Sequence, residues 1–326
     1  MQYFRDKRVL VTGGSGFIAS HLCHRLIKDG AKVSVLTKYN SVIDNIRLVD
    51  AWSQINVVES DLRNLDSLQQ IKLLRPHIIY HFAAYNHVGD SFIHISEAID
   101  VNSMGTVNLL SSCGDYEKFI YISSSEIYGY QKTIPFSEDM TPFPVSPYAV
   151  GKYSGELYAR MQRQVFNKPV VVLRPFNAFG PYQSPRAIIA ELIIKCLKGE
   201  DIITTEGIQT RDFNYVENLV DGFILAGQND NVLGEVINLG SGCEISIKTL
   251  VKEIHKMTNS KSKLYIGKLP YRPTEIWRMV ADNKKAKKIL KWKPAIDFKE
   301  GLLSTIKWYE KFNKIFLDAG SALYKL

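Results

Sequence analysis

Short apolar runs rich in β-branched residues alternate with amphipathic stretches through the first half of the chain. In order, the runs are RVLVTG, KVSVLT, INVVES, HIIYHFAA, KFIYISSS and PVVVLRP. Between them, apolar residues recur at helical spacing, which predicts helices near 17–29, 65–74, 97–113 and 147–165. Strands that read as continuous apolar runs are typical of parallel sheets covered by helices on both faces. The sequence therefore predicts an α/β fold built on a doubly wound parallel sheet.

The first of these runs leads directly into a glycine-rich turn. Gly14, Gly16 and Ala19 satisfy the pattern G-x-G-x-x-G/A between a predicted strand and a predicted helix. Because glycine has no Cβ atom, a pyrophosphate can approach the backbone of such a turn, and the helix N-terminus offers free N–H donors. The turn predicts a dinucleotide site of the Rossmann type, with a tight structural turn as the alternative.

The end of the second strand bears on which dinucleotide binds. An NAD site usually has an acid there, which hydrogen-bonds the ribose 2′-hydroxyl. Here the strand ends in Thr37 and Lys38. A lysine can pair with a 2′-phosphate, so the sequence favours NADP over NAD, with Lys38 as a solvated loop residue being the alternative. Asp61, after the third strand, is placed to meet the adenine edge.

The alternating pattern ends after Pro175. It gives way to a segment rich in Pro, Gly and Gln, a helix predicted near 187–198, and short mixed elements. We expect a dinucleotide-binding domain over 1–175, to which 210–240 returns. A smaller mixed α/β substrate-binding lobe is expected from 176–209 and 241–326, with a ligand cleft between the two parts.

Charge and composition limit the classes of partner. The net charge is +8, and much of the excess lies in KKAKKILKWK at 284–293, where the lysines fall on one face of a predicted helix. No basic groove with stacking aromatics is apparent, so no nucleic acid partner is expected. The chain has no apolar run near the roughly 20 residues of a spanning helix and no signal-peptide core. We expect a cytoplasmic protein with no membrane partner.

The four cysteines lie far apart and form no C-x-x-C pair. This spacing predicts free, buried thiols and no metal site.

A tyrosine and a lysine form the first candidate for chemistry. The segment SPYAVGK places Tyr148 and Lys152 four residues apart behind Pro147, a favourable helix opener. Residues at this spacing share a helix face, and a nearby cation favours the ionised form of a phenol. The pair could therefore act as an acid or base near neutral pH. A surface pair is the alternative, but the preceding strand ends in YISSSEIYG, at the sheet edge where such folds hold their ligands.

Together these motifs resemble the extended short-chain dehydrogenases/reductases that modify nucleotide sugars. In family order they are TGGSGFI, DL at 61–62, HFAA at 81–84, SSSEIYG at 123–129, SPYAVGK at 146–152, RPFNAFGP at 174–181, TRDFNYV at 210–216, NLGSG at 238–242 and YRP at 271–273. The resemblance covers nearly the whole chain. It implies a nucleotide-diphosphate sugar as substrate, and a homodimer formed through the helices near 97–113 and 147–165.

The resemblance also implies roles for individual residues. Tyr148 and Lys152 would be the catalytic pair, and Ser124 would bond the reacting sugar oxygen. Arg211 and Arg272 would clamp the substrate diphosphate, which suits the planar guanidinium fork. The other cofactor contacts that it implies are Gly13, Gly16, Phe17, Ile18, Leu62, Ala83 and Ala84, besides Thr37, Lys38 and Asp61. The other substrate contacts are His87, Asn177 and Arg186.

The segment Ser124-Ser125-Glu126 bears on the reaction. Family epimerases commonly carry a small or neutral residue at the last position, whereas 4,6-dehydratases carry a hydroxyl residue, then Asp or Ser, then Glu. We therefore expect a 4,6-dehydratase that converts an NDP-hexose, or an NDP-N-acetylhexosamine, to the 4-keto-6-deoxy sugar, with a tightly bound and recycled cofactor. Glu126 would remove the C5 proton and, with Ser125 in place of Asp, would itself protonate the leaving C6 hydroxyl.

Other reactions remain open on the sequence. An NADPH-dependent 4-keto-6-deoxy-sugar reductase would suit Lys38, an NDP-sugar 4-epimerase would suit the family, and an NDP-uronic acid decarboxylase carries a similar hydroxyl-Ser-Glu motif. Glu126 could also be a carboxylate that faces solvent or holds a loop. A silent dinucleotide-binding regulator would lack the Tyr148 and Lys152 pair. We interpret His81 as a packed strand residue and His87 as a loop residue near the nicotinamide.

Overall fold

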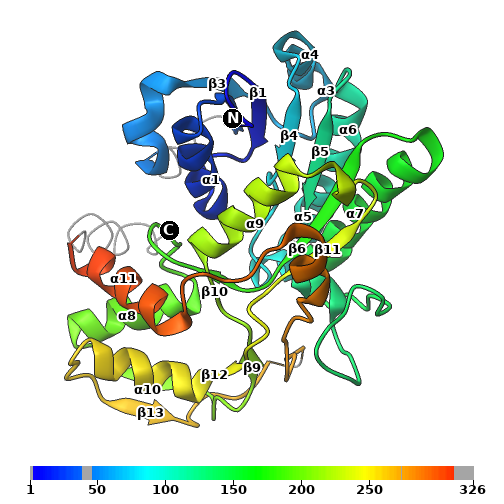
Figure 1. The fold of residues 1–326 in the computed structure, drawn as a ribbon. Helices are drawn as coiled ribbons and strands as arrows, with labels where there is room; N and C mark the ends of the chain where they lie inside the picture. Colours follow the sequence, from blue (N-terminus) through cyan, green and yellow to red (C-terminus); the bar gives the residue numbers. More distant parts are fainter. Residues whose placement is uncertain (1–2, 39–45, 273, 312–326) are drawn as a thin grey trace.

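The computed structural model describes residues 3–38, 46–272 and 274–311, and its centre is a seven-stranded sheet (Figure 1). The strands follow the order β11-β6-β5-β4-β1-β2-β3, and every neighbouring pair is parallel. Their bounds are β1 Arg8–Thr12, β2 Lys32–Thr37, β3 Ile55–Glu59, β4 Ile78–His81, β5 Lys118–Ile122, β6 Val170–Pro175 and β11 Val236–Leu239. The predicted doubly wound parallel sheet is confirmed.

Both faces of the sheet are buried, which explains why its strands read as continuous apolar runs. Val9 and Val11 of β1 pack in a core cluster with α1 (Phe17–Lys28) and α9 (Val216–Gln228). Leu10, between them, points to the other face and packs in a cluster with residues of α6 (Gly105–Ser112) and α7 (Pro147–Phe166). Successive residues of a strand point to opposite faces, so each apolar run supplies two cores.

Two predicted helices are interrupted in the structure. The segment predicted as 65–74 forms α3 (Leu65–Leu68) and α4 (Gln70–Leu74), and 97–113 forms α5 (Ile95–Ile99), the π-helical turn η3 (Asp100–Met104) and α6. The wide turn carries Asn102 against α7, where a Cβ atom at Gly155 would lie 2.5 Å from the Asn102 carbonyl oxygen. Periodicity alone cannot indicate such a turn, because it depends on the close approach of two helices.

The helix predicted at 147–165 is confirmed as α7. Ser146 caps its N-terminus by accepting a hydrogen bond from the Ala149 N–H, and Pro147 follows as its first residue. The helix ends at Phe166, and its C-cap residue Asn167 has a left-handed φ of 52°. Its start therefore fixes where Tyr148 and Lys152 lie.

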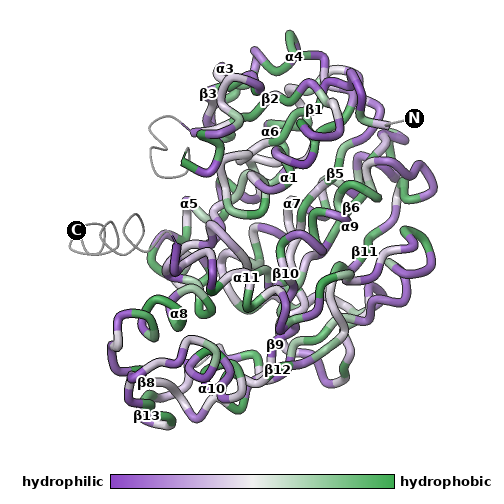
Figure 2. Tube along the Cα trace, turned by 60° about the vertical axis from the view of Figure 1, so that its left-hand side comes forward, coloured by the Kyte–Doolittle hydropathy of each residue, from purple (hydrophilic) through white to green (hydrophobic). Residues whose placement is uncertain are grey.

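A second hydrophobic cluster is built from the later part of the chain. It joins α8 (Ile188–Lys198), α10 (Ile247–Met257) and α11 (Phe298–Lys311). The short strand pairs are β7 with β10 (Ala178–Phe179 and Asn214–Tyr215), β8 with β13 (Ile202–Thr204 and Leu264–Ile266), and β9 with β12 (Thr210–Arg211 and Ile245–Ser246). Figures 1 and 2 show α8, α10 and β13 together at one end of the molecule, away from the large sheet, and Figure 2 shows β8 beside β13.

The chain crosses between the two clusters more than once. β11 is a strand of the large sheet, and α9 packs in the core cluster on one of its faces. Ala286 and Leu290 of the π-helical turn η6 (Ala286–Leu290) pack in the same cluster, together with Trp292. The lysine-rich segment thus packs its apolar residues on the sheet, although the expected substrate lobe included it. The division into two domains stays a prediction.

Within residues 3–38, 46–272 and 274–311, no helix has the length and apolar character needed to cross a bilayer. All four cysteines are free, but Cys243 is exposed and Cys113 only half-buried, so the prediction of buried thiols holds for Cys23 and Cys196 alone. No group of three or more His, Cys, Asp or Glu side chains in these ranges is arranged to hold a metal ion.

Candidate active site

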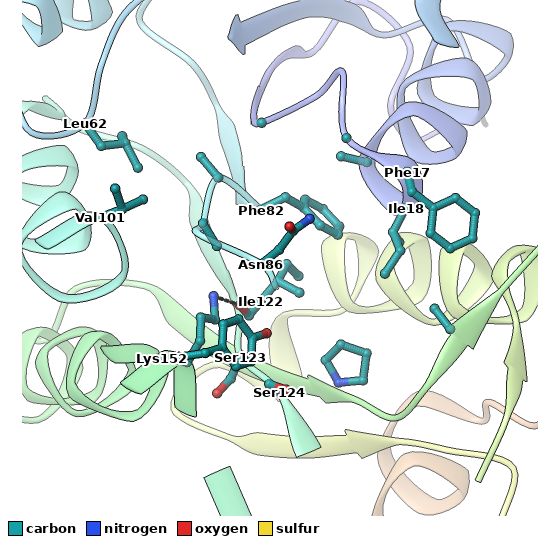
Figure 3. A pocket seen from close by; sticks show the side chains of 18 of the residues that line it. Phe17, Ile18, Leu62, Phe82, Asn86, Val101, Ile122, Ser123, Ser124 and Lys152 are labelled. Atoms are coloured by element: carbon teal, nitrogen blue, oxygen red, sulfur yellow. Dashed lines mark hydrogen bonds between the residues drawn. The ribbon is translucent and has the colours of Figure 1, made fainter. Parts of the chain in front are cut away.

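A cavity of about 540 Å³ lies along the carboxyl ends of the sheet strands (Figure 3). Parallel α/β sheets place their ligands at this edge, because loops from several strands meet there. Most of the residues predicted from the sequence line the cavity: Gly13, Gly16, Phe17, Ile18, Thr37, Lys38, Asp61, Leu62, Ala83, Ala84, Ser124, Ser125, Glu126, Tyr148, Lys152 and Asn177. Four predicted substrate contacts, His87, Arg186, Arg211 and Arg272, lie outside this lining.

The glycine turn forms one wall of the cavity. Gly13 has a φ of +65°, and a Cβ atom there would lie 2.8 Å from the Cα of Ala83. A Cβ at Gly14 would lie 2.7 Å from a methyl carbon of Val35. Gly16 begins α1 without any side-chain cap, so no side-chain oxygen occupies the first N–H donors of that helix. This turn fits a dinucleotide pyrophosphate, whose oxygens would accept from these donors.

Charged residues gather at the ends of β2 and β3, where the adenosine half of a dinucleotide would lie. The Lys38 Nζ is 3.7 Å from a carboxylate oxygen of Glu97, and an Arg63 nitrogen is 3.5 Å from the same oxygen. Arg63 also hydrogen-bonds Asp61 at 2.6 Å, and this contact lowers the pKa of Asp61. Sequence reasoning missed Arg63, although it follows the DL pair directly. Thr37 is buried behind this group.

The predicted catalytic pair is brought together with Ser124. Tyr148 hydrogen-bonds Ser124, while burial raises the pKa of Tyr148 to about 12. Burial also lowers the pKa of Lys152 to about 7. The Lys152 ammonium donates to the Ile122 carbonyl (Figure 3). It also lies 4.6 Å from the centre of the Tyr121 ring. The sequence led us to expect that Lys152 would favour the phenolate, but in the structure burial dominates both groups.

Glu126 enters the same cavity from the 3-10 turn η4 (Ser125–Tyr128) at the end of β5. Its backbone N–H donates to the Ser124 hydroxyl at 3.2 Å, which aligns the turn. Among the described residues, none donates a hydrogen bond to its carboxylate. Burial raises the pKa of Glu126, opposed by the charges of Arg211 and Arg272 and reinforced by that of Glu275. The side chain is thus a carboxyl group without a structural partner, beside Tyr148.

Ser125 has a different environment. Its hydroxyl is buried and donates to the Met279 sulfur at 3.3 Å. It is therefore anchored in the apolar cluster that contains Met279.

The predicted phosphate-binding arginines, Arg211 and Arg272, lie close enough to Glu126 for their charges to act on its carboxyl group. Arg211 donates to the Glu275 carboxylate and to the Ile276 carbonyl, both at 2.6 Å. Arg272 is exposed, and its charge acts on both Glu126 and His87. Neither arginine lines the cavity, so their role as diphosphate contacts stays a prediction.

Two other predicted substrate contacts, Arg186 and His87, contact the same carboxylate, that of Asp90. Arg186 makes a two-pronged ion pair with Asp90, at 2.7 and 2.6 Å, and His87 Nδ1 is 3.2 Å from the same carboxylate.

Asn177 lines the cavity, and its Oδ1 is buried without a hydrogen-bond partner. A buried acceptor of this kind is satisfied when a hydroxyl or N–H of a ligand reaches it.

His81 is confirmed as a packed strand residue. It is 1% exposed, and its two ring nitrogens are 2.7 Å from the Thr12 hydroxyl and 3.1 Å from the Thr106 hydroxyl.

Comparisons with known proteins agree with this arrangement. Residues 10–305 match the family model described as GDP-mannose 4,6 dehydratase. The chain is 33% identical to dTDP-D-glucose 4,6-dehydratase of Bos taurus, over 97% of this chain and 92% of the relative. An epimerase from Methanothermobacter thermautotrophicus superposes with a TM-score of 0.90 at 29% identity, covering 97% and 96% of the two chains. A UDP-glucuronic acid 4-epimerase from Bacillus cereus, solved with UDP-glucuronic acid and NAD, superposes with a TM-score of 0.87 at 31% identity, covering 94% and 99%.

Proposed function

The chain belongs to the GDP-mannose 4,6-dehydratase family of extended short-chain dehydrogenases/reductases, and on that premise we propose that it is a nucleotide-sugar 4,6-dehydratase. It is an enzyme of the family that includes both nucleotide-sugar dehydratases and epimerases. The finer choice between these reactions is our proposal. One observation carries it: Glu126 presents an unpaired carboxylate to the cavity beside Tyr148.

The reaction explains why such a carboxylate is useful. Elimination of water across C5 and C6 requires removal of the C5 proton, which becomes acidic once C4 is a ketone. A 4-epimerase has no proton to remove at C5, so it has no use for a base there. The raised pKa of Glu126 suits a group that must first take a proton and then release it.

The cavity fits a nicotinamide dinucleotide, because the glycine turn has the space and the free N–H donors that a pyrophosphate needs. Gly13, Gly16 and the start of α1 would hold the pyrophosphate, and Lys152 would bond the nicotinamide ribose. When bound, a nicotinamide would supply a reversible acceptor for the hydride of the sugar's C4–H bond.

The chain's own residues move the protons. Tyr148, as its phenolate, would accept the proton of the 4-hydroxyl group, with Ser124 bonded to the same oxygen. The Lys152 cation would favour this phenolate against the burial that raises the pKa of Tyr148 to about 12. Glu126 then removes the C5 proton, and the C6–O bond breaks as Glu126 passes that proton to the departing hydroxyl, which leaves as water. Hydride return to C6 would be completed by addition of a solvent proton at C5, and Tyr148 would release its proton to solvent. The product is the 4-keto-6-deoxy sugar, and the cofactor ends unchanged.

We further propose NADP as the cofactor rather than NAD. Lys38 and Arg63 both line the adenosine end of the cavity, and both can pair with a 2′-phosphate. Solved neighbours from Bacillus cereus and Thermus thermophilus contain NAD, and binding of NADP and NAD to the purified protein, compared by calorimetry, tests the choice.

We also propose a homodimer formed through α7 and the helical segments near 97–113. Val150 and Leu157 of α7 are 44% and 47% exposed, and Met104 of η3 is 49% exposed. Apolar side chains on neighbouring helices are commonly covered by a partner. Sedimentation or light scattering of the purified protein tests this point.

A substrate panel tests the reaction. The purified protein, without added cofactor, is incubated with UDP-, GDP-, CDP- and dTDP-linked hexoses and N-acetylhexosamines, and product masses are followed. Loss of one water supports the proposal and identifies the nucleotide. Unchanged mass with a new sugar configuration would indicate an epimerase, loss of carbon dioxide a decarboxylase, and a requirement for added NADPH a reductase.

A further inference from the structure

A buried ion pair lies directly behind the candidate catalytic residues and belongs to neither the cofactor nor the substrate contacts. Glu156 is 0% exposed and Arg174, in β6, is 1% exposed. Arg174 donates to both carboxylate oxygens of Glu156, with its Nε at 3.1 Å and its Nη2 at 2.6 Å. Two-pronged pairs of this kind are strongly directional, so the pair fixes α7 against β6.

The pair is connected to the catalytic group by two separate routes. Glu156 follows Lys152 by four residues on α7, so both side chains lie on the same helix face. The Glu156 carboxylate also accepts a hydrogen bond from the Ser123 hydroxyl at 2.7 Å. Ser123 immediately precedes Ser124, so this bond fixes the end of β5 where Ser124 meets Tyr148.

The network continues away from the cavity on the arginine side. Arg174 Nη1 donates to the Tyr128 hydroxyl at 2.7 Å, and Tyr128 donates to the Asn238 side-chain oxygen at 2.8 Å. Tyr128 belongs to η4, the turn that carries Glu126. The pair therefore joins α7, β6 and both ends of the Ser124 to Tyr128 segment.

We propose that Glu156 and Arg174 are positioning residues of the reaction, which set the place of Ser124 through Ser123 and supply a buried negative charge to Lys152. Only the kinetic part of this inference, the effect on the rate of C4 oxidation, rests on the proposed function. Oxidation at C4 precedes the step that separates dehydratases from epimerases, so the positions of Ser124 and Lys152 matter equally for both.

Few charged or titratable groups face Lys152. On α7 they are Glu156 and Tyr148, on β5 Tyr121, and on β4 His81, whose pKa is lowered by burial and by the Lys152 charge. Glu156 is the carboxylate among them, and its charge raises the pKa of Lys152 against the effect of burial. Loss of that charge should therefore favour the neutral amine.

The test measures Lys152 directly in the protein without cofactor or substrate. Lysine side chains are labelled with nitrogen-15, the Lys152 signal is assigned by its absence in K152M, and its titration midpoint is followed by NMR. In E156Q we expect the midpoint to fall by about one pH unit, since an opposite charge is lost and Arg174 is left unpaired. In E156Q/R174M, which removes both charges, the fall should be smaller.

Kinetics test the positioning role separately. S123A removes only the hydroxyl, and T305V removes another fully buried hydroxyl, on α11, as the matched control. We expect S123A to lower the rate of C4 oxidation by about tenfold without moving its pH profile. T305V should leave both unchanged.

The outcomes are separable. A folded E156Q protein with the wild-type Lys152 midpoint would overturn the electrostatic role, and S123A with the wild-type oxidation rate would overturn the positioning role. If E156Q does not fold, R174K keeps the charge but loses the fork, and wild-type C4 oxidation in that variant would also overturn the proposal. Failure of the dehydratase assignment would leave the Lys152 titration unaffected.

Discussion

Replacement of Glu126 by Gln separates the two halves of the proposed reaction. The amide has nearly the same shape as the carboxylate, and no described residue donates a hydrogen bond to the Glu126 side chain. The substitution also removes the repulsion from Glu275. We therefore expect the fold to remain intact, with a change in the free energy of unfolding below about 1 kcal/mol.

The kinetic effect should be large and confined to one step. Loss of a positioned general base typically costs a factor of about 10²–10⁴ in rate, equivalent to about 3–5 kcal/mol of barrier. C4 oxidation depends on Tyr148 and Ser124 and should change only a few-fold. Reduced nicotinamide should then accumulate in E126Q, because elimination no longer follows.

A single-turnover experiment provides the assay. Enzyme in excess is mixed with substrate, the absorbance of reduced nicotinamide is followed, and the release of water is measured by product mass. E235Q is the matched control, because Glu235 pairs with Lys285 and does not line the cavity. Water loss at the wild-type rate in E126Q would refute the reasoning. An equal fall in both steps would also refute it, since it would mean that Glu126 supports the site as a whole.

Three further predictions follow from the geometry. In G13A, the new methyl group would lie 2.8 Å from the Ala83 backbone, and residue 13 would have to keep a left-handed φ. We therefore expect the cofactor affinity, measured by calorimetry, to fall and the free energy of unfolding to drop by about 1–3 kcal/mol. In K38A, loss of a phosphate partner should lower the affinity for NADP about tenfold and leave that for NAD unchanged, and equal effects on both would contradict the NADP assignment. Burial lowers the pKa of His21 to about 4, whereas in the unfolded chain His21 keeps its ordinary pKa of 6.5. Between these two pH values the unfolded chain binds a proton more readily than the folded protein does. The free energy of unfolding should therefore decrease as the pH falls from about 6.5 to 4. Thermal unfolding across this pH window should show a shallower decrease in H21Q, and an identical slope would contradict the role of His21.

The parts of the fold that follow from local rules could be predicted from the sequence. The alternation of apolar runs gave the parallel sheet, since strands buried on both faces must be apolar throughout. Gly14 and Gly16 predicted the turn, and a Cβ atom at these positions would lie 2.7 Å from a methyl carbon of Val35 and 3.0 Å from the Gly13 carbonyl oxygen. Ser146 and Pro147 located the start of α7, and with it the shared face of Tyr148 and Lys152.

The parts that depend on tertiary contact could not be predicted. The π-helical turn η3 exists because Asn102 packs against the glycines of α7. The pKa of Tyr148 is raised rather than lowered because burial outweighs the hydrogen bond with Ser124, and burial depth is not readable from spacing. The ion pair of Arg186 with Asp90 joins residues far apart in the chain, which one sequence cannot reveal.

Glu156 and Arg63 lie between these two cases. Glu156 follows Lys152 at the same four-residue spacing that identified the catalytic pair, so its place on that helix face was available from the sequence. Its burial and its pairing with Arg174 were not. Arg63 directly follows the DL motif, but its contact with Asp61 appears only in the structure.

The fate of the hydride at C4 tests the central claim most directly. A substrate that carries deuterium at C4 is converted by the purified protein, and the product is examined by NMR. We predict that the deuterium moves to C6 of a 4-keto-6-deoxy sugar. Its return to C4 in a sugar that has kept its C6 hydroxyl would contradict the account and identify the protein as a 4-epimerase.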